Sequence, residues 1–103
     1  MQIKYFTRIA AAALIATAAA GSAYAYTGSE LEKDAKISLD AAKEIAMKTR
    51  PGTVTDQELE KEAGGSGLRY SFDIRQDKTT YEVGVDAQTG KVLENSKEGP
   101  NPD

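Results

Sequence analysis

The chain offers few residue types suited to catalysis. It contains no histidine and no cysteine, which excludes the Ser-His-Asp triad, the cysteine nucleophile and the usual zinc sites. A serine activated by lysine, or a pair of carboxylates, is what remains. Ser38 with Lys43, or Ser71 with a lysine from elsewhere, could form the first arrangement. Ser38 has a simpler explanation as a helix cap, so we expect no catalytic residue, no cofactor and no enzymatic activity.

Four acidic residues alternate along one segment: Asp56, Glu58, Glu60 and Glu62. In a strand they would form an acidic row on one face. Such a row could bind calcium or contact a basic partner. It could also be a solvated face whose charge opposes edge-to-edge aggregation. No Asp-x-Asp-x-Asp-Gly loop accompanies the row, so we expect no metal site. Sensing of calcium or a small ligand by residues 56–62 remains the alternative function.

Residues 37–52 have the pattern of an amphipathic helix. Ser38 is placed to cap its first turn, and Pro51-Gly52 halts it. Its apolar stripe consists of Leu39, Ala42, Ile45, Ala46 and Thr49.

The next segment, residues 53–62, is ambiguous between a strand and a helix. Thr53, Val54 and Thr55 favour a strand, whereas the sequence "DQELEKEA" favours a helix. Val54 and Leu59 are five residues apart, which fits neither period. If the segment is a strand, we expect it to be irregular or bulged.

Residues 68–75 and 81–86 alternate apolar and polar side chains and predict a β-hairpin. A two-residue or a four-residue loop would keep both apolar sets on one face. The two-residue loop would give Lys78 a positive φ and would pair Asp73 with Glu82. We therefore expect the four-residue loop, with Arg75 opposite Glu82. The inner face would hold Leu68, Tyr70, Phe72, Ile74, Tyr81, Val83 and Val85.

The polar stretch from Asp86 to Gly90 is a turn before a short final strand at Val92 and Leu93. Asp86 can fold its carboxylate back onto amides about two residues on, and Gly90 can adopt the left-handed conformation. A bound ligand is not needed to explain this turn. The loop Gly64–Gly67 lacks the residues of a phosphate loop and is expected to be a hinge between strands.

Residues 1–25 have the pattern of a secretory signal peptide. Lys4 and Arg8 precede an apolar run of about a dozen residues, too short to span a bilayer. Ala23 and Ala25 form a small-x-small pattern that predicts cleavage before Tyr26. We therefore expect a periplasmic or secreted protein with no stable membrane anchor after cleavage.

The chain left by this cleavage is acidic and has room for one domain. Without Lys4 and Arg8, 11 cations face 16 acids, a formal charge of −5. This charge does not suit nucleic acid or anionic lipid. We expect a flexible arm at 26–36, one ordered domain at 37–94 and a disordered tail at 95–103. Because no disulfide is available, the domain must depend on one small apolar core.

The segments "ISLDAAKEIAMKTRPG", "YSFDI" and "TYEVGVDAQTGKVLE" together resemble the PepSY domain, a module of peptidase propeptides and small exported bacterial proteins. The likeness covers about residues 37–94. It implies an α+β fold in which one N-terminal helix packs on a three- to four-stranded antiparallel sheet. This is why we expect a strand at 53–62.

The resemblance also implies that the protein binds, and inhibits or modulates, a peptidase or another envelope protein. It transfers no catalytic residue to this sequence. An edge strand and an open sheet face are where an extended partner could add. We expect the partner-contact surface to include Val54, Asp56, Glu58, Glu60, Arg69 and Arg75.

Overall fold

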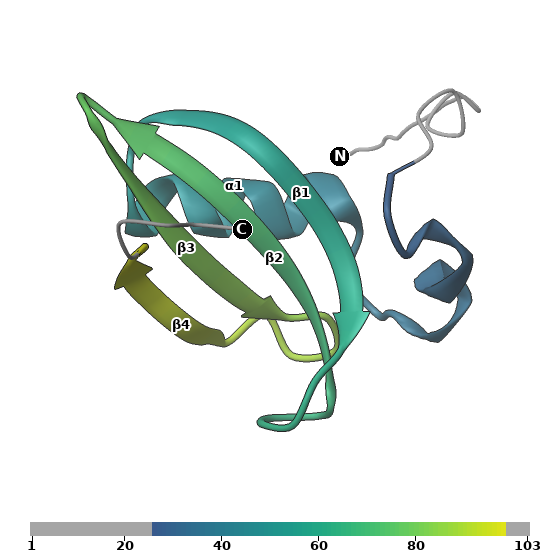
Figure 1. Cartoon of the computed structure of the whole chain (residues 1–103). Helices are drawn as coiled ribbons and strands as arrows, with labels where there is room; N and C mark the ends of the chain where they lie inside the picture. Colours follow the sequence, from purple (N-terminus) through teal and green to yellow (C-terminus); the bar gives the residue numbers. More distant parts are fainter. Residues whose placement is uncertain (1–25, 99–103) are drawn as a thin grey trace, which may run out of the picture.

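The computed structural model describes residues 26–98, which form one antiparallel sheet and one α-helix. The sheet order is β1-β2-β3-β4, and α1 lies behind the sheet in Figure 1, covering one face and leaving the other open. This confirms the predicted α+β fold and shows the sheet to have four strands. The bounds are η2 Ser29–Asp34, α1 Leu39–Thr49, β1 Thr53–Lys61, β2 Leu68–Gln76, β3 Thr79–Asp86 and β4 Val92–Lys97.

The predicted signal peptide, with Ala23 and Ala25 of the cleavage site, lies outside the described residues, as do residues 99–103. Of the residues that are described, none belongs to a helix long and apolar enough to cross a membrane.

Helix α1 begins and ends where the sequence predicts. The Ser38 hydroxyl accepts a hydrogen bond from the amide of Ala41 (3.0 Å). Ala42 and Ala46 have no solvent exposure, because their small side chains let the helix approach the sheet closely. The helix ends at Thr49, and Pro51 follows Arg50.

Strand β1 contains the irregularity that the spacing of its apolar residues predicts. The register with β2 shifts between Val54 and Asp56, so Thr55 is an extra residue. The bulge places both Val54 and Leu59 on the side of the sheet that faces α1. A regular strand would have put two residues five apart on opposite faces.

The β2–β3 hairpin has the expected inner face but not the expected loop. Gln76 pairs with Thr79, which leaves the two-residue loop Asp77-Lys78 and sets Asp73 opposite Glu82. The predicted four-residue loop is wrong. Asp77 has φ 58° and is the one non-glycine residue of the described chain with positive φ. Lys78 therefore does not adopt the positive φ that was the argument against a two-residue loop. Aspartate tolerates this conformation better than most residues.

The core lies between α1 and the inner face of the sheet. Phe72, Ile74, Val83 and Val85 are fully buried, and Tyr70 is 1% exposed. The Tyr70 hydroxyl donates a hydrogen bond to the carbonyl of Ile37 (2.8 Å), which satisfies its polar end.

The turn after β3 is held by the carboxylate of Asp86, as predicted. Asp86 Oδ1 accepts from the amides of Gln88 (2.8 Å) and Thr89 (3.2 Å), and Gly90 has φ 81°. Ser66, in the loop between β1 and β2, also donates its amide to Oδ2 (2.7 Å) and its hydroxyl to Oδ1 (2.8 Å). Asp86 therefore joins two loops that are 20 residues apart in sequence.

Residues 26–36, expected to be a flexible arm, carry regular structure in the fold. Thr27 forms a parallel bridge with Glu58, and the amide of Leu59 donates to the Thr27 carbonyl (2.9 Å). Gly28 follows with φ 89°, and a Cβ at this position would overlap the Leu59 carbonyl. Only glycine fits this close approach.

The same segment then forms η2 and rejoins the core. Its apolar residues are irregularly spaced, so their contacts arise from the tertiary fold and not from a local period. Those that pack against the core are Tyr26, Leu31 and Ala35. At the other end, β4 continues to Lys97, three residues beyond the predicted boundary at Glu94.

Candidate binding surface at the β1 edge

The six residues predicted to contact a partner fall on two surfaces. Val54 lies on the helix side of β1, opposite Ile74. The other five, Asp56, Glu58, Glu60, Arg69 and Arg75, lie on the open face of the sheet. Asp56 and Arg75 are exposed, whereas Arg69 is only 6% exposed. The predicted surface is therefore two neighbouring surfaces that meet along β1.

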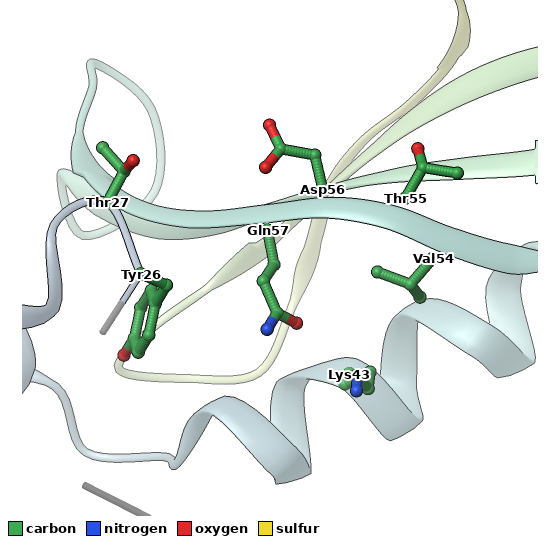
Figure 2. Close-up of a pocket in the computed structure, with 7 residues that line it drawn as sticks. All are labelled: Tyr26, Thr27, Lys43, Val54, Thr55, Asp56 and Gln57. Atoms are coloured by element: carbon green, nitrogen blue, oxygen red, sulfur yellow. The ribbon is translucent and has the colours of Figure 1, made fainter. Parts of the chain in front are cut away.

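A groove of about 530 Å³ lies between the outer edge of β1 and helix α1. Figure 2 shows that Val54 and Gln57 extend from β1 towards the helix, whereas Thr55 and Asp56 point to the other side. The residues that line the groove are Tyr26, Thr27, Lys43, Val54, Thr55, Asp56 and Gln57. Only Val54 and Asp56 belong to the surface predicted from the sequence.

The backbone of β1 presents hydrogen-bonding groups to this groove. Hydrogen-bonded and non-hydrogen-bonded pairs alternate along an antiparallel ladder. Because the Leu59 amide is directed outward to Thr27, the amide and carbonyl of Gln57 are also directed outward. The pair of Gln57 with Phe72 is thus of the non-hydrogen-bonded type. Two residues further along β2, the pair of Val54 with Ile74 is of the same type, so Val54 also presents its backbone to the edge.

The N-terminal segment covers only part of this edge. Thr27 pairs at Glu58 and Leu59, and η2 packs beside the same end of β1. Among residues 26–98, no strand pairs with residues 53–57 on this side, so within the described part of the chain they form the open half of the edge, with the groove beside them. Sequence reasoning missed this division because it treated residues 26–36 as an arm without contacts.

The open face of the sheet buries an arginine among acids. Arg69 Nη1 lies 3.3 Å from Glu94 and 3.9 Å from Glu62, and Arg69 Nη2 donates to the carbonyl of Ala63 (3.2 Å). Gly84 leaves room for this guanidinium, since a Cβ there would lie 3.2 Å from Nη1. The buried Arg69 side chain therefore binds other residues of the same chain and helps to hold the fold. The sequence predicts it instead as part of the partner-contact surface.

Three other acids of this face, Asp73, Glu82 and Glu98, gather at its centre, with one carboxylate oxygen of each within 4.8 Å of the others. Burial and the charges of Glu94, Asp73, Glu60 and Glu98 raise the pKa of Glu82 to about 7. Burial also raises the pKa of Asp73. The cluster can therefore hold a proton near neutral pH. It includes no residue of the acidic segment 56–62.

The fold and this surface define a small α+β module without an evident catalytic constellation among residues 26–98. The chain matches the family described as Peptidase propeptide and YPEB domain (PepSY) over residues 36–95, more than half of its length. It belongs to this family and is a peptidase-propeptide-like module. No curated protein and no solved structure matched the chain. The groove residues Tyr26 and Thr27 lie outside the matched range.

Proposed function

We propose that the protein is a non-enzymatic, exported module that binds an extended segment of a peptidase or another envelope protein. The observation that carries this proposal is the groove beside the open half of the β1 edge. An edge strand with outward backbone groups is a template for strand addition by another chain. Membership of the PepSY family supports a partner of the peptidase class.

The mode of binding has an intramolecular precedent in the same strand. Thr27 already accepts a hydrogen bond from the Leu59 amide at the neighbouring positions of the edge. A partner segment beside residues 53–57 would extend this pairing with main-chain hydrogen bonds to Val54 and Gln57. Holding a partner segment in this way would restrain it, which gives a physical route to inhibition or modulation.

Replacement of Val54 by proline tests this mode. Proline removes an outward amide and no hydrogen bond to β2, so the sheet should persist. We expect the exported wild-type chain to retain a specific envelope protein on affinity purification and V54P to retain at least tenfold less. Glu82→Gln, on the open face, is the matched control and should retain as much as the wild type. Equal retention by V54P and wild type would refute the edge mode.

Export is part of the same proposal. The charged leader, the short apolar run and Ala23-Tyr24-Ala25 support processing before Tyr26. N-terminal sequencing of the chain from the periplasm or medium should begin at Tyr26. A chain that begins at Met1 in a membrane fraction would contradict export with release.

Ion sensing is the second candidate, and the grouping of Asp73, Glu82 and Glu98 favours it. Since an ion that binds only the folded state raises the melting temperature, a thermal-shift titration with calcium tests it. A rise in wild type that is absent in Glu82→Gln would support the candidate. An unchanged melting temperature at millimolar calcium would remove it.

A further inference from the structure

One cation that lines the β1 groove has no counterion within the described part of the chain. We infer that the groove selects an extended partner segment with a single carboxylate, from aspartate or glutamate, at the position that faces α1. This inference rests on the proposed function and adds to it the chemistry of the guest.

The cation is Lys43 of α1. Figure 2 shows it below the stretch of β1 between Val54 and Gln57. The residue is half-buried, and within the described part of the chain its ammonium group makes no ion pair and no hydrogen bond. Asp40 and Glu44 of the same helix do not pair with it. A charge that is unpaired and partly shielded from water attracts a carboxylate more strongly than a fully exposed one.

A guest strand at the open half of the edge brings a side chain to this cation. Its backbone would pair with the outward groups of Val54 and Gln57, and every second side chain of a strand points to the same face. The guest side chains on the helix side therefore enter the groove beside Lys43. Because the lysine ammonium stands on a flexible four-carbon stem, it can turn to meet a guest carboxylate without movement of the backbone.

The other side of the edge limits the guest to an isolated acid. Asp56 is exposed and points away from the helix side, and Glu58 follows it on the same open face. The guest residues on either side of the inward one point to that face, where a second carboxylate would be repelled. The groove therefore favours one acid flanked by neutral or basic residues over an acidic run.

The occupant is a segment of another protein and not a second copy of this chain. Two copies joined edge to edge by a two-fold axis in one antiparallel sheet would have their helices on the same face. This arrangement would bring the two Lys43 side chains together on one face and the two Asp56 side chains together on the other. Like charges would then meet on both faces, whereas a guest with an inward acid places opposite charges together.

A display selection tests this inference. Random linear peptides of nine residues are selected at low ionic strength, where ion pairs are least screened, against the processed, exported chain and its variants. Folding of each variant is checked by circular dichroism. Lys43→Gln removes the charge, and Lys43→Glu reverses it. Lys48→Glu is the matched control, because it changes the net charge equally at an exposed lysine of α1 that does not line the groove. Val54→Pro removes an edge amide.

Wild type and K48E should enrich peptides in which one position holds aspartate or glutamate about threefold over asparagine or glutamine, as expected of a partly screened ion pair. K43Q should enrich extended peptides without this preference. K43E should prefer lysine or arginine at the same position, and V54P should enrich none.

An unchanged acid preference in K43Q and K43E, or a loss as large in K48E as in K43E, would overturn the inference and leave edge binding standing. No enrichment by wild type, or equal enrichment by V54P and wild type, would overturn edge binding and the inference with it. A wild-type chain that sediments as a dimer, where V54P sediments as a monomer, would assign the edge to a second copy and overturn both.

Discussion

The two faces of the sheet use opposite chemistry. The face under α1 is mainly apolar, and Phe72, Val83 and Val85 at its centre are fully buried. The open face brings Asp73, Glu82 and Glu98 within 4.8 Å of one another and buries Arg69 beside Glu94. One set of strands therefore carries a stabilising face and a face strained by like charges.

This difference separates stability from binding. Burial on the helix side supplies the free energy that holds a small domain without disulfides. Charge repulsion on the open face opposes folding at neutral pH and keeps that face from stacking on another sheet. The groove lies at the edge of β1, where the two faces of the sheet meet. There the outward-directed backbone of β1 lies beside the polar side chain of Gln57.

The largest effect is expected from Phe72→Ala on the covered face. Removal of this fully buried ring leaves a cavity and should lower the free energy of unfolding by about 3–5 kcal/mol. Because native proteins are stable by only about 5–15 kcal/mol, this loss is a large fraction of the total free energy of unfolding. Urea denaturation followed by circular dichroism measures it. Arg75→Ala, at an exposed site of the open face, is the control and should change stability by less than about 0.5 kcal/mol.

An intermediate effect is expected from Asp86→Asn, which alters the well-paired carboxylate of β3. Burial would raise the pKa of Asp86, but the hydrogen bonds from Gln88, Ser66 and Thr89 outweigh it and lower the pKa from 3.8 to about 2. The ionised form thus stabilises the fold above pH 3.8, and this contribution is lost as the pH falls through 2. Its size is about 2 kcal/mol.

D86N should therefore be less stable than wild type at pH 7 by about 2 kcal/mol. The difference should shrink between pH 3.8 and pH 2, as wild type loses the same contribution. Thermal unfolding at stepped pH values measures both. A difference that stays constant down to pH 2 would show that hydrogen bonding to the carboxylate is not the cause.

The smallest effect is expected from Glu82→Gln, which alters the repelled carboxylate of the same strand. Its pKa is raised from 4.5 to about 7, so the folded state binds more protons than the unfolded state between these values. Wild-type stability should then fall as the pH rises from 4.5 to 7, by on the order of 1 kcal/mol after allowance for solvent screening.

E82Q should lose this dependence and should be more stable than wild type at pH 8. The measurement is the melting temperature at pH 5 and pH 8 for both chains. A wild-type protein that is more stable at pH 8 than at pH 5, with E82Q unchanged in slope, would mean that the open face is not strained by charge.

Features encoded in short stretches could be predicted from the sequence. The cap at Ser38, the bulge implied by Val54 and Leu59, and the turn at Asp86 each follow from a few neighbouring residues. The alternation in β2 and β3 gave the inner face correctly because a strand places every second side chain on one side.

Features that depend on distant residues could not be predicted in this way. Gly28 is informative only once the Leu59 carbonyl lies against it, and Arg69 is buried only because Gly84 leaves room in the next strand. The two-residue β2–β3 loop depends on the positive φ of Asp77. An aspartate tolerates this conformation, but its presence in the sequence does not predict it. Among the residues that line the groove, Val54 and Asp56 could be predicted from the sequence. Gln57, Lys43 and the N-terminal residues could be assigned to the groove only from the structure.

Hydrogen exchange at individual β1 amides, measured by NMR on the processed chain, tests edge binding most directly. In the free protein the Leu59 amide should exchange slowly, because it donates to Thr27, and the amides of Val54 and Gln57 should exchange fast. With a partner segment bound, Val54 and Gln57 should become protected at least tenfold. If a bound partner leaves their exchange unchanged, the partner does not add to the β1 edge.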